Sequence, residues 1–506
     1  MPDTAPGPLV PTSSADGSSR RWLALFFIAI AQLMVSVDST IVNIALPSAQ
    51  RDLHISDANR QWVITAYLLA FGGLLLLGGR IADTYGRKRA FLIGLVGFAL
   101  SSAIGGAAVD TAMLLGARAL QGAFGALLAP AGLSLLAVTF TEQRERAKAF
   151  GVFSAIAGSG AAVGLILGGV LTEYLNWRWS LFVNVAFALV VLIGAVPNVH
   201  DVDRDETAPS RMDVPGAVLV TGGLVALVYA FTRADSDGWT AGSTLGLFAV
   251  FVVLLAAFIR VEQRSDAPLL PLRVVTERTR AGVFATQALA VITMFGLLLF
   301  LTYYLQVVRG YSPLMAGVAF LPMVLGMLVG AGQVASRLMT RLPARWIMGP
   351  GFLVAALGAL LLTQLTVSSS YPVVVLPGEF LFGLGLGIAF TPAMSLATEH
   401  VDPQDAGVAS AMINAAQQVG GSIGTALLNT IAASATASWL VSHHGGGNLT
   451  DRAAVHGYAT AMWWTVGILV LAALVILVAV NAQVPTPATG PDDADNPAVD
   501  LERATR

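Results

Sequence analysis

The sequence has no cysteine among its 506 residues. This absence excludes disulfide bridges, thiolate chemistry and cysteine-ligated metal centres. Lysine is almost missing too, because only Lys88 and Lys148 occur, and they follow Arg87 and Ala147. The Gly-Lys-(Ser/Thr) core of a P-loop is therefore absent, and the chain does not use ATP through a motif of that kind.

Charged residues are scarce as well. They make up 11% of the chain, while 56% of the residues are hydrophobic and the mean hydropathy is +0.73. Ordinary soluble proteins carry about a quarter charged residues, so this chain has too little polar surface for a water-soluble fold. Apolar runs of about 20 residues recur along it, which is typical of membrane-spanning helices.

Other classes of function lack their usual marks. No basic patch with interleaved aromatic residues is present, so a nucleic acid is not expected as a partner. The six histidines fall in loops or at the ends of apolar runs, and no cluster of metal ligands or nucleophile–base motif occurs. We therefore expect no metal or other cofactor and no enzymatic activity.

The apolar runs predict an all-α polytopic membrane protein with fourteen transmembrane helices. We place the spans at residues 22–47, 60–79, 90–108, 112–138, 147–171, 179–196, 214–232, 242–260, 282–307, 313–336, 346–366, 372–398, 407–434 and 457–481. The expected organisation is a disordered tail (1–21), a six-helix half (22–196), a linker with two extra helices (197–281), a second six-helix half (282–481) and a disordered tail (482–506).

The basic residues orient these spans. Arg20 and Arg21 precede the first span, and most other arginines fall in loops on the same side of the membrane. Because cytoplasmic loops carry an excess of Lys and Arg, both termini are predicted to be cytoplasmic. The abundance of Ala, Gly, Val and Arg suggests a bacterial genome rich in GC, so we expect the protein in the bacterial cytoplasmic (inner) membrane. We also expect it to be a monomer.

Two of the spans are similar to each other. At a constant offset, the fourth and the twelfth share three residues, which are Gly116/Gly378, Gly125/Gly387 and Pro130/Pro392. Parallel halves of this kind, arranged around a central substrate path, occur in secondary transporters. The two extra helices then form an insertion between the halves.

A charged segment interrupts the apolar sequence between the second and third spans. It reads Gly79-Arg-Ile-Ala-Asp83-Thr-Tyr-Gly86-Arg87-Lys88 and resembles the signature loop of the major facilitator superfamily, Gly-x-x-x-Asp-x-x-Gly-Arg-(Lys/Arg). We expect a cytoplasmic gate, with Asp83 near a helix N-terminus and Arg87 bound to an acidic partner. Simple positive-inside anchoring is the alternative, and it explains Lys88 but not Asp83.

Further motifs resemble the fourteen-span drug:proton antiporter branch of that superfamily. They are Asp38-Ser-Thr-Ile-Val-Asn43-Ile-Ala-Leu-Pro47, Arg118 with Gln121 and Gly122, Gly160-x-x-x-Gly164-Leu-Ile-Leu-Gly168-Gly169, and Phe182-Val-Asn184. Leu165 stands where the antiporter motif of the fifth span has proline. The glycines of that span permit close helix approach. They are expected either to bend or seal the substrate path or simply to pack closely.

The resemblance implies a function. We expect a proton-coupled antiporter that exports amphipathic, cationic drugs, dyes or antibiotics by alternating access, with the proton gradient as its energy source and no cofactor. A dedicated exporter of one metabolite or of a self-made antibiotic is a second hypothesis. A membrane receptor or intramembrane enzyme is a third, which the missing motifs disfavour.

Three ionisable residues fall inside predicted spans, where charge is costly and usually functional. They are Asp38, Arg118 and Glu379, all expected in the outer half of the membrane. Our hypothesis is that Asp38 carries the proton and Arg118 is its partner, because a guanidinium favours the ionised carboxylate while apolar burial opposes it. The alternative is a static ion pair that joins the first span to the fourth.

Glu379 and several amides complete the candidate site. Glu379 is interpreted as a second proton site or a cation anchor, or else as a hydrated glutamate near the outer surface. A polar cavity is predicted from the amides Asn43, Gln121, Asn414, Gln417 and Gln418. Hydrogen bonding between helices is the equally simple alternative for these five side chains.

Overall fold

A computed structural model describes residues 14–57, 59–140, 142–199, 213–265, 268–270, 272–398, 406–443 and 449–480. In these ranges the chain is built from helices and contains no strand. Thirteen helical stretches are long and apolar enough to cross a membrane, and α16, with 37 residues, is a further long helix. The all-helical fold with fourteen spans is thereby confirmed.

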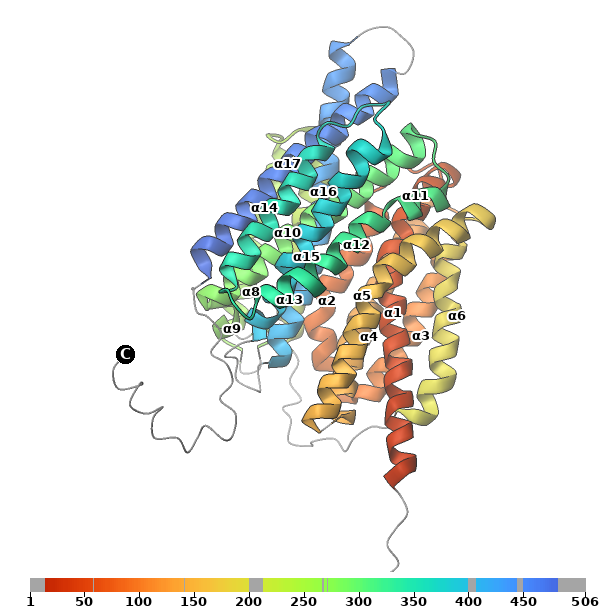
Figure 1. The fold of residues 1–506 in the computed structure, drawn as a ribbon, viewed down its shortest axis with the longest axis vertical. Coiled ribbons are helices and arrows are strands. Elements are labelled where there is room, and N and C mark those ends of the chain that lie inside the picture. The colour runs from red at the N-terminus through yellow and green to blue at the C-terminus, as the bar shows by residue number, and fades with distance from the viewer. Residues whose placement is uncertain are drawn as a thin grey trace, which may run out of the picture.

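The N-terminal half consists of six helices that stand nearly parallel (Figure 1). They are α1 (Ser14–Asp52), α2 (Trp62–Tyr85), α3 (Arg87–Gly106), α4 (Thr111–Thr139), α5 (Gln143–Tyr174) and α6 (Trp179–Asn198). The first helix begins inside the segment predicted as a disordered tail, because extending a formed helix costs far less than starting one. Tail residues 1–13 and 482–506 lie outside the described residues.

The C-terminal half has six spans with more breaks. They are α10 (Arg278–Tyr303) with η1 (Tyr304–Val308); α11 (Pro313–Ala319), α12 (Leu321–Val329), η2 (Gly330–Ala335) and α13 (Ser336–Leu338); α14 (Arg345–Leu362); η3 (Tyr371–Val375) with α15 (Leu376–Thr398); α16 (Ala406–Ser442); and α17 (Leu449–Ala479). The η segments are π-helical turns. The repeat predicted between the fourth and twelfth spans has a structural counterpart, since α4 packs on α2 and α3 while α15 packs on α12 and α14.

Several helices begin at capping side chains. Asp110 accepts a hydrogen bond from the Met113 amide at the start of α4 (2.8 Å). Glu277 accepts from the amides of Thr279 and Arg280 at the start of α10. These carboxylates satisfy amide groups that have no partner within the helix. Between α2 and α3 the chain turns at Gly86, whose φ of 105° is a conformation that glycine adopts without strain.

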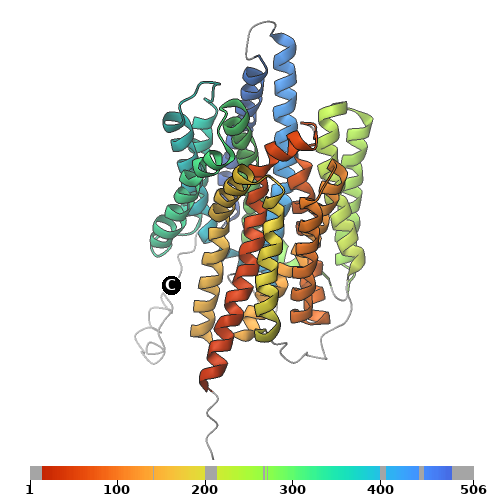
Figure 2. The ribbon, with the colours of Figure 1, turned by 90° about the vertical axis from the view of Figure 1, so that its right-hand side faces the viewer.

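The inserted pair α7 (Val214–Asp237) and α8 (Gly242–Glu262) stands at one side of the bundle (Figure 2). Helix α7 packs against α2 of one half and α16 of the other. Only 11% of the apolar window of α8 is buried, against 78% for α10. Because so much of its apolar surface is uncovered by protein, α8 offers that surface to lipid. The short helix α9 (Leu272–Thr276) leads from this pair to α10.

The two halves meet mainly toward one end of the bundle. We call this end outer and the other inner, following the predicted orientation. Outer parts of α2 and α16 pack together, as do the outer parts of α5 and α11, whereas the two groups of helices diverge toward the inner end (Figure 1). The structure therefore has the arrangement of a carrier that is closed on its outer side.

Candidate functional site

Asp38 of α1 and Arg118 of α4 form a buried ion pair inside the N-terminal half. The Arg118 Nη1 donates to Asp38 Oδ2 over 2.7 Å, and the exposed fractions of the two side chains are 2% and 0%. A charge buried this deeply is tolerated only with a partner of opposite sign and further hydrogen bonds. The contact predicted between the first and fourth spans is therefore present.

Two amide side chains complete the shell of Asp38. Gln121 Nε2 and Asn184 Nδ2 both donate to Asp38 Oδ1, over 2.8 and 2.7 Å. The same two nitrogens lie 3.2 and 3.0 Å from Ser102 Oγ, and that hydroxyl donates to the Leu181 carbonyl. Of the two alternatives predicted for Gln121, hydrogen bonding between helices holds rather than a place on a cavity wall, because its partners lie in the interior of the half.

Arg118 is also held from α2. Its Nε donates to the Val63 carbonyl (3.1 Å), and its guanidinium lies 4.3 Å from the ring centroid of Tyr67. The Tyr67 hydroxyl is buried and has no hydrogen-bond partner. Five helices, α1, α2, α3, α4 and α6, thus contribute to one polar cluster, so movement of any of them relative to the others disturbs the ion pair.

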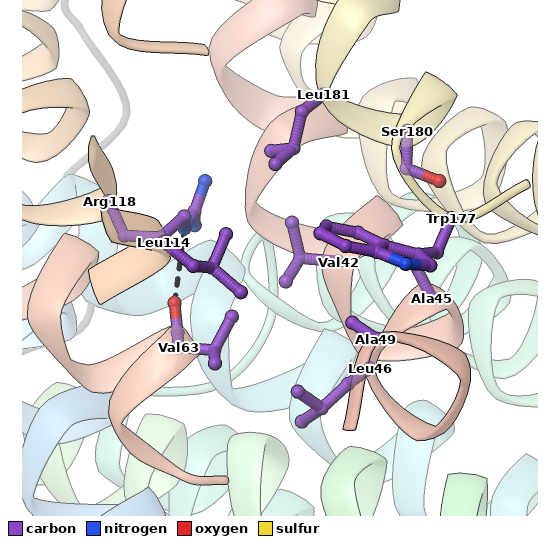
Figure 3. Close-up of a pocket in the computed structure, with 10 residues that line it drawn as sticks. All are labelled: Val42, Ala45, Leu46, Ala49, Val63, Leu114, Arg118, Trp177, Ser180 and Leu181. Carbon is purple, nitrogen blue, oxygen red and sulfur yellow. Dashed lines mark hydrogen bonds between the residues drawn. The ribbon is translucent and has the colours of Figure 1, made fainter. Parts of the chain in front are cut away.

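A small apolar void adjoins this cluster on its outer side (Figure 3). Val42 and Ala49 of α1 line it together with Trp177, while Arg118 lies at its other end. The void has room for about one water molecule, but a space with so few polar walls tends to stay dry. In this arrangement the ion pair is therefore shielded from outer water.

Sequence reasoning did not place Ser102, Tyr67 and Asn184 at this site. Asn184 lies in the motif Phe182-Val-Asn184, and a polar residue within an apolar run could have indicated a buried hydrogen-bonding role. Ser102 and Tyr67 gave none, because serine and tyrosine occur in membrane helices for many reasons. Their contact with Arg118 and its partners depends on the packing of α2 and α3 around α4.

Glu379 of α15 lies apart from the pair, in the interior of the C-terminal half. Its exposed fraction is 0%, and neither carboxyl oxygen has a hydrogen-bond partner. The hydrated glutamate near the outer surface, one of the two predicted alternatives, is therefore wrong. An ionised carboxylate without a partner is very costly in such surroundings, so the buried group is expected to be neutral.

The outer seal between the halves consists of direct contacts of α1, α2 and the loop between them with the C-terminal half. Arg60 Nε donates to Asn429 Oδ1 (3.4 Å), and its guanidinium lies 4.0 Å from the ring centroid of Tyr303. The Tyr303 hydroxyl in turn donates to Gln50. Arg60 is mostly buried although it belongs to an outer loop, which shows how tightly the seal closes.

Comparison with known proteins shows which family has this architecture. The family model described as Major Facilitator Superfamily matches residues 28–425. The chain belongs to the major facilitator superfamily. The puromycin resistance protein pur8 of Streptomyces alboniger is 49% identical over 486 residues, covering 95% of this chain and 96% of that protein. The cephamycin export protein CmcT of Amycolatopsis lactamdurans is 38% identical over 86% of this chain and 90% of that protein.

Solved structures agree on the fold. A bacterial homologue of the human lysosomal transporter Spinster, in an inward-facing and unoccupied conformation, superimposes with a TM-score of 0.64 at 16% identity, covering 91% of this chain and 97% of that one. At this identity the likeness concerns the fold alone. The chain is accordingly a multi-pass membrane transporter of the superfamily rather than an enzyme.

The superfamily's signature loop lies at the inner end between α2 and α3. Arg87 Nε is 3.4 Å from Asp83 Oδ1, and both side chains are substantially exposed. The acidic partner predicted for Arg87 is thus Asp83 itself, four residues earlier on the other side of the turn at Gly86. Lys88 Nζ donates to the Val196 carbonyl at the end of α6 (2.9 Å). A gate formed by this loop stays a prediction for the state that is closed inside.

In α2 the glycine packed closely against α4 is Gly78, which directly precedes the motif residue Gly79. A Cβ at Gly78 would lie 2.1 Å from the Ala126 carbonyl oxygen of α4, whereas one at Gly79 would have no contact shorter than 3.7 Å. Gly79 is therefore not required by contact in this arrangement. The tight approach of α2 to α4 depends on Gly78 instead.

The glycines of α5 have two different roles. Gly160, Gly164 and Gly168 face α1, where an added Cβ would clash with Ser36, Thr40 or Ile41. Gly169 instead faces the other half, because a Cβ there would lie 2.6 Å from Leu314 Cα. Plain close packing holds for the first three, while Gly169 belongs to the seal between α5 and α11.

The remaining predicted polar residues have different surroundings. Asn43 is buried and donates to the Ser39 carbonyl of its own helix (3.2 Å), and Gln417 donates to Gln287 of α10 (3.0 Å). Gln418 lies at the junction with α2, where a Cβ at Gly72 would be 2.8 Å from its Cβ. Asn414 is partly exposed on α16. A substrate role for these residues stays a prediction.

Proposed function

We propose that this transporter exports an amphipathic antibiotic or drug from the bacterial cytoplasm in exchange for protons, with both termini cytoplasmic. The observation that carries the proposal is the completely buried Asp38, held by Arg118, Gln121 and Asn184 across the helices of one half. Support for the cargo comes from relatives named for puromycin resistance and cephamycin export.

The chemistry of exchange follows from the ion pair. In the outer-closed arrangement three donors point at the two oxygens of Asp38, and such donors favour a carboxylate over a carboxyl group. When the outer side opens, a proton from outer water converts Asp38 to its neutral form, and the attraction to Arg118 is lost. Opening on the inner side returns that proton to the cytoplasm and restores the pair. The carboxylate thereby gains and loses one proton in each cycle.

Coupling requires that cargo and proton favour different states of the carrier. A cationic cargo favours the ionised carboxylate electrostatically, so it competes with the proton for Asp38. A ligand shifts a conformational equilibrium only through its different affinity for the two states. The static ion pair is the competing interpretation, in which Asp38 keeps its charge throughout the cycle.

A dedicated exporter is a second candidate function. The identity of 49% with a puromycin resistance protein, over nearly the whole length of both chains, favours it. Expressing cells would then tolerate puromycin or one related amphipathic amine and gain nothing against unrelated toxic cations. Broad tolerance would favour multidrug export.

The direct test uses purified protein in proteoliposomes. Uptake of radiolabelled puromycin and of a fluorescent organic cation is measured with an imposed pH gradient, with the gradient collapsed, and with Asp38→Asn. We expect gradient-driven uptake by the parent and none by Asp38→Asn, although binding of the cargo persists. Full gradient-driven transport by Asp38→Asn would exclude Asp38 as the carrier. Ser39→Ala, which removes a hydroxyl that bonds within the same helix, serves as the control.

A further inference from the structure

Glu379 is a buried titratable group that the proposed exchange through Asp38 does not use. Of the elements packed on α15, the described parts of α10, α12, η2, α14 and α16 carry no ionisable side chain beyond Tyr303 at the outer end of α10 and the arginines at the inner starts of α10 and α14. Tyr371 of η3 interacts with Glu379 electrostatically. No cation is therefore positioned to compensate an ionised Glu379.

Burial and proton occupancy of Glu379 are consequently linked. With the outer side closed, both of its oxygens lie in an apolar interior without a donor, which disfavours the ionised form strongly. Water at the same carboxyl group would stabilise the ionised form near neutral pH. A state that hydrates Glu379 is thus favoured by high pH, and a state that buries it is favoured by low pH.

The place of Glu379 connects it to the outer seal. It lies just after the π-helical turn η3, a type of turn that is frequent at functional sites. In that turn the Tyr371 hydroxyl donates to the Ala319 carbonyl at the end of α11 (2.6 Å). Helix α11 in turn packs on α5 of the other half, where a Cβ at Gly317 would lie 2.3 Å from the Leu165 carbonyl oxygen.

A second contact strengthens the same seal. Glu173 at the end of α5 accepts a hydrogen bond from the Leu314 amide at the start of α11 (3.0 Å). The outer end of α15 is thus joined to α11 by Tyr371, and α11 is joined to the N-terminal half by its first two turns. A change that separates η3 from α11 would loosen this side of the seal.

We propose that Glu379 is a second proton-binding site, loaded from the outer side, and that the outer seal closes only when the site is occupied. This inference rests on the proposed function for the direction of the cycle. Outer water supplies the proton, the carboxylate becomes a neutral carboxyl group, and the half then buries it. The proton returns to outer water when the seal reopens and the carboxyl group is hydrated again. Asp38 differs because its ionised form is compensated in the closed state.

The absence of cysteine gives a direct assay of the seal. Thr425 of α16 is completely buried, and its Oγ1 lies 2.8 Å from Thr65 Oγ1 of the other half. Thr425→Cys would react with a membrane-impermeant maleimide in right-side-out vesicles only when the outer side opens. Val109→Cys, at an outer loop residue that is 77% exposed, corrects for the intrinsic pH dependence of thiol labelling.

With Glu379 present, we expect corrected labelling of Thr425→Cys to rise several-fold as the outer pH increases from about 5 to about 8. Adding Glu379→Gln should leave labelling low and independent of pH, and Glu379→Asp should restore the response. An unchanged pH response in Glu379→Gln would overturn the proposal, as would a parent that shows no response. Tyr371→Phe, which removes the hydroxyl bonded to Ala319, should weaken the pH dependence of labelling. This variant keeps the proposal testable if Glu379→Gln does not accumulate in the membrane.

Asp38→Asn separates this inference from the proposed function. We expect it to abolish gradient-driven transport while the labelling response to outer pH persists. Loss of the response in Asp38→Asn, with retention in Glu379→Gln, would assign the outer proton site to Asp38 alone. Transport that survives Asp38→Asn would defeat the proposed carrier without touching the labelling result for Glu379.

Discussion

The two halves of this transporter treat a buried carboxyl group in opposite ways. Asp38 and Glu379 both have an exposed fraction of 0%. Asp38 has a guanidinium and two amides against its oxygens, whereas Glu379 has no hydrogen-bond partner for either oxygen. Burial alone therefore does not decide the charge of a carboxyl group, because the donors supplied by neighbouring helices decide it.

The internal repeat makes this comparison sharper. Glu379 aligns with Ala117, the residue before Arg118, so the C-terminal half has a carboxyl group where the N-terminal half has a methyl group. Phe380 occupies the position equivalent to Arg118. The compensated acid Asp38 lies on α1, whereas the uncompensated acid Glu379 lies on the helix equivalent to α4, which carries the arginine partner of Asp38.

Arg118→Met should have the largest effect, because it leaves the buried Asp38 carboxylate without its cation. Removing one partner of such a pair costs about 3–5 kcal/mol. We expect a clearly lower thermal unfolding midpoint of the detergent-solubilised protein. The double variant with Asp38→Asn should recover part of the loss, and an unaltered midpoint in Arg118→Met would break the comparison.

Asn184→Leu should come next. It removes one donor to Asp38 and one contact with Ser102, and a hydrogen bond to a charged group is worth about 1.5–3 kcal/mol. Unfolding midpoints would check this against Asn43→Leu, whose amide donates only within its own helix. Equal losses of unfolding midpoint in the two variants would mean that the hydrogen bonds to Asp38 stabilise the protein no more than a bond within one helix.

Arg60→Gln should weaken the outer seal without affecting either carboxyl group directly. The lost ring contact and hydrogen bond amount to about 1–2 kcal/mol, so labelling of Thr425→Cys should rise roughly tenfold at constant pH. Arg51→Gln is the matched control, because Arg51 is exposed and bonds within its own helix. Labelling that stays at the parent rate would remove Arg60 from the seal.

Glu379→Gln should change stability by less than about 1 kcal/mol, because the neutral amide replaces a carboxyl group that is already neutral when buried. Thermal unfolding near pH 7 measures this. A large loss would show that the carboxyl group is charged and has a partner in the folded protein. That result would make the two halves alike.

Asp83→Asn should have the smallest effect on stability, within about 0.5 kcal/mol, because its pair with Arg87 is exposed. Export should nevertheless fall if the loop closes the inner side in the other state. Measuring the unfolding midpoint and gradient-driven uptake on the same preparation separates these effects. Unchanged export would leave positive-inside anchoring as the role of the loop.

Much of the architecture was predictable from the sequence. Long apolar runs and sparse charge determine helices that cross a membrane, since lipid offers no partner for an open backbone. The signature loop and the motif with Arg118 indicated the superfamily, and the cost of intramembrane charge indicated Asp38 and Arg118 as partners. Their contact is confirmed because each residue makes the other tolerable.

Other parts of the site could not be predicted. The amides were expected either to face a cavity or to bond between helices, and only the structure shows that Gln121 bonds to Asp38 and Gln417 to Gln287. Helical periodicity gives the face on which a side chain lies but not which helix packs there. Arg60 gave no signal at all, because its role depends on Tyr303, 243 positions further along the chain, being brought beside it by the closed outer side.

The sequence by itself determined that this protein is a helical membrane transporter with two related halves and a few costly internal charges. These properties follow from composition, periodicity and local motifs. Only the tertiary structure decided which charges are compensated, which glycines permit close helix packing and which contacts close the outer side. Hydrogen bonds and ion pairs between distant segments form only when their atoms lie within a few ångströms of each other. The packing of the helices sets these distances, and the local sequence does not.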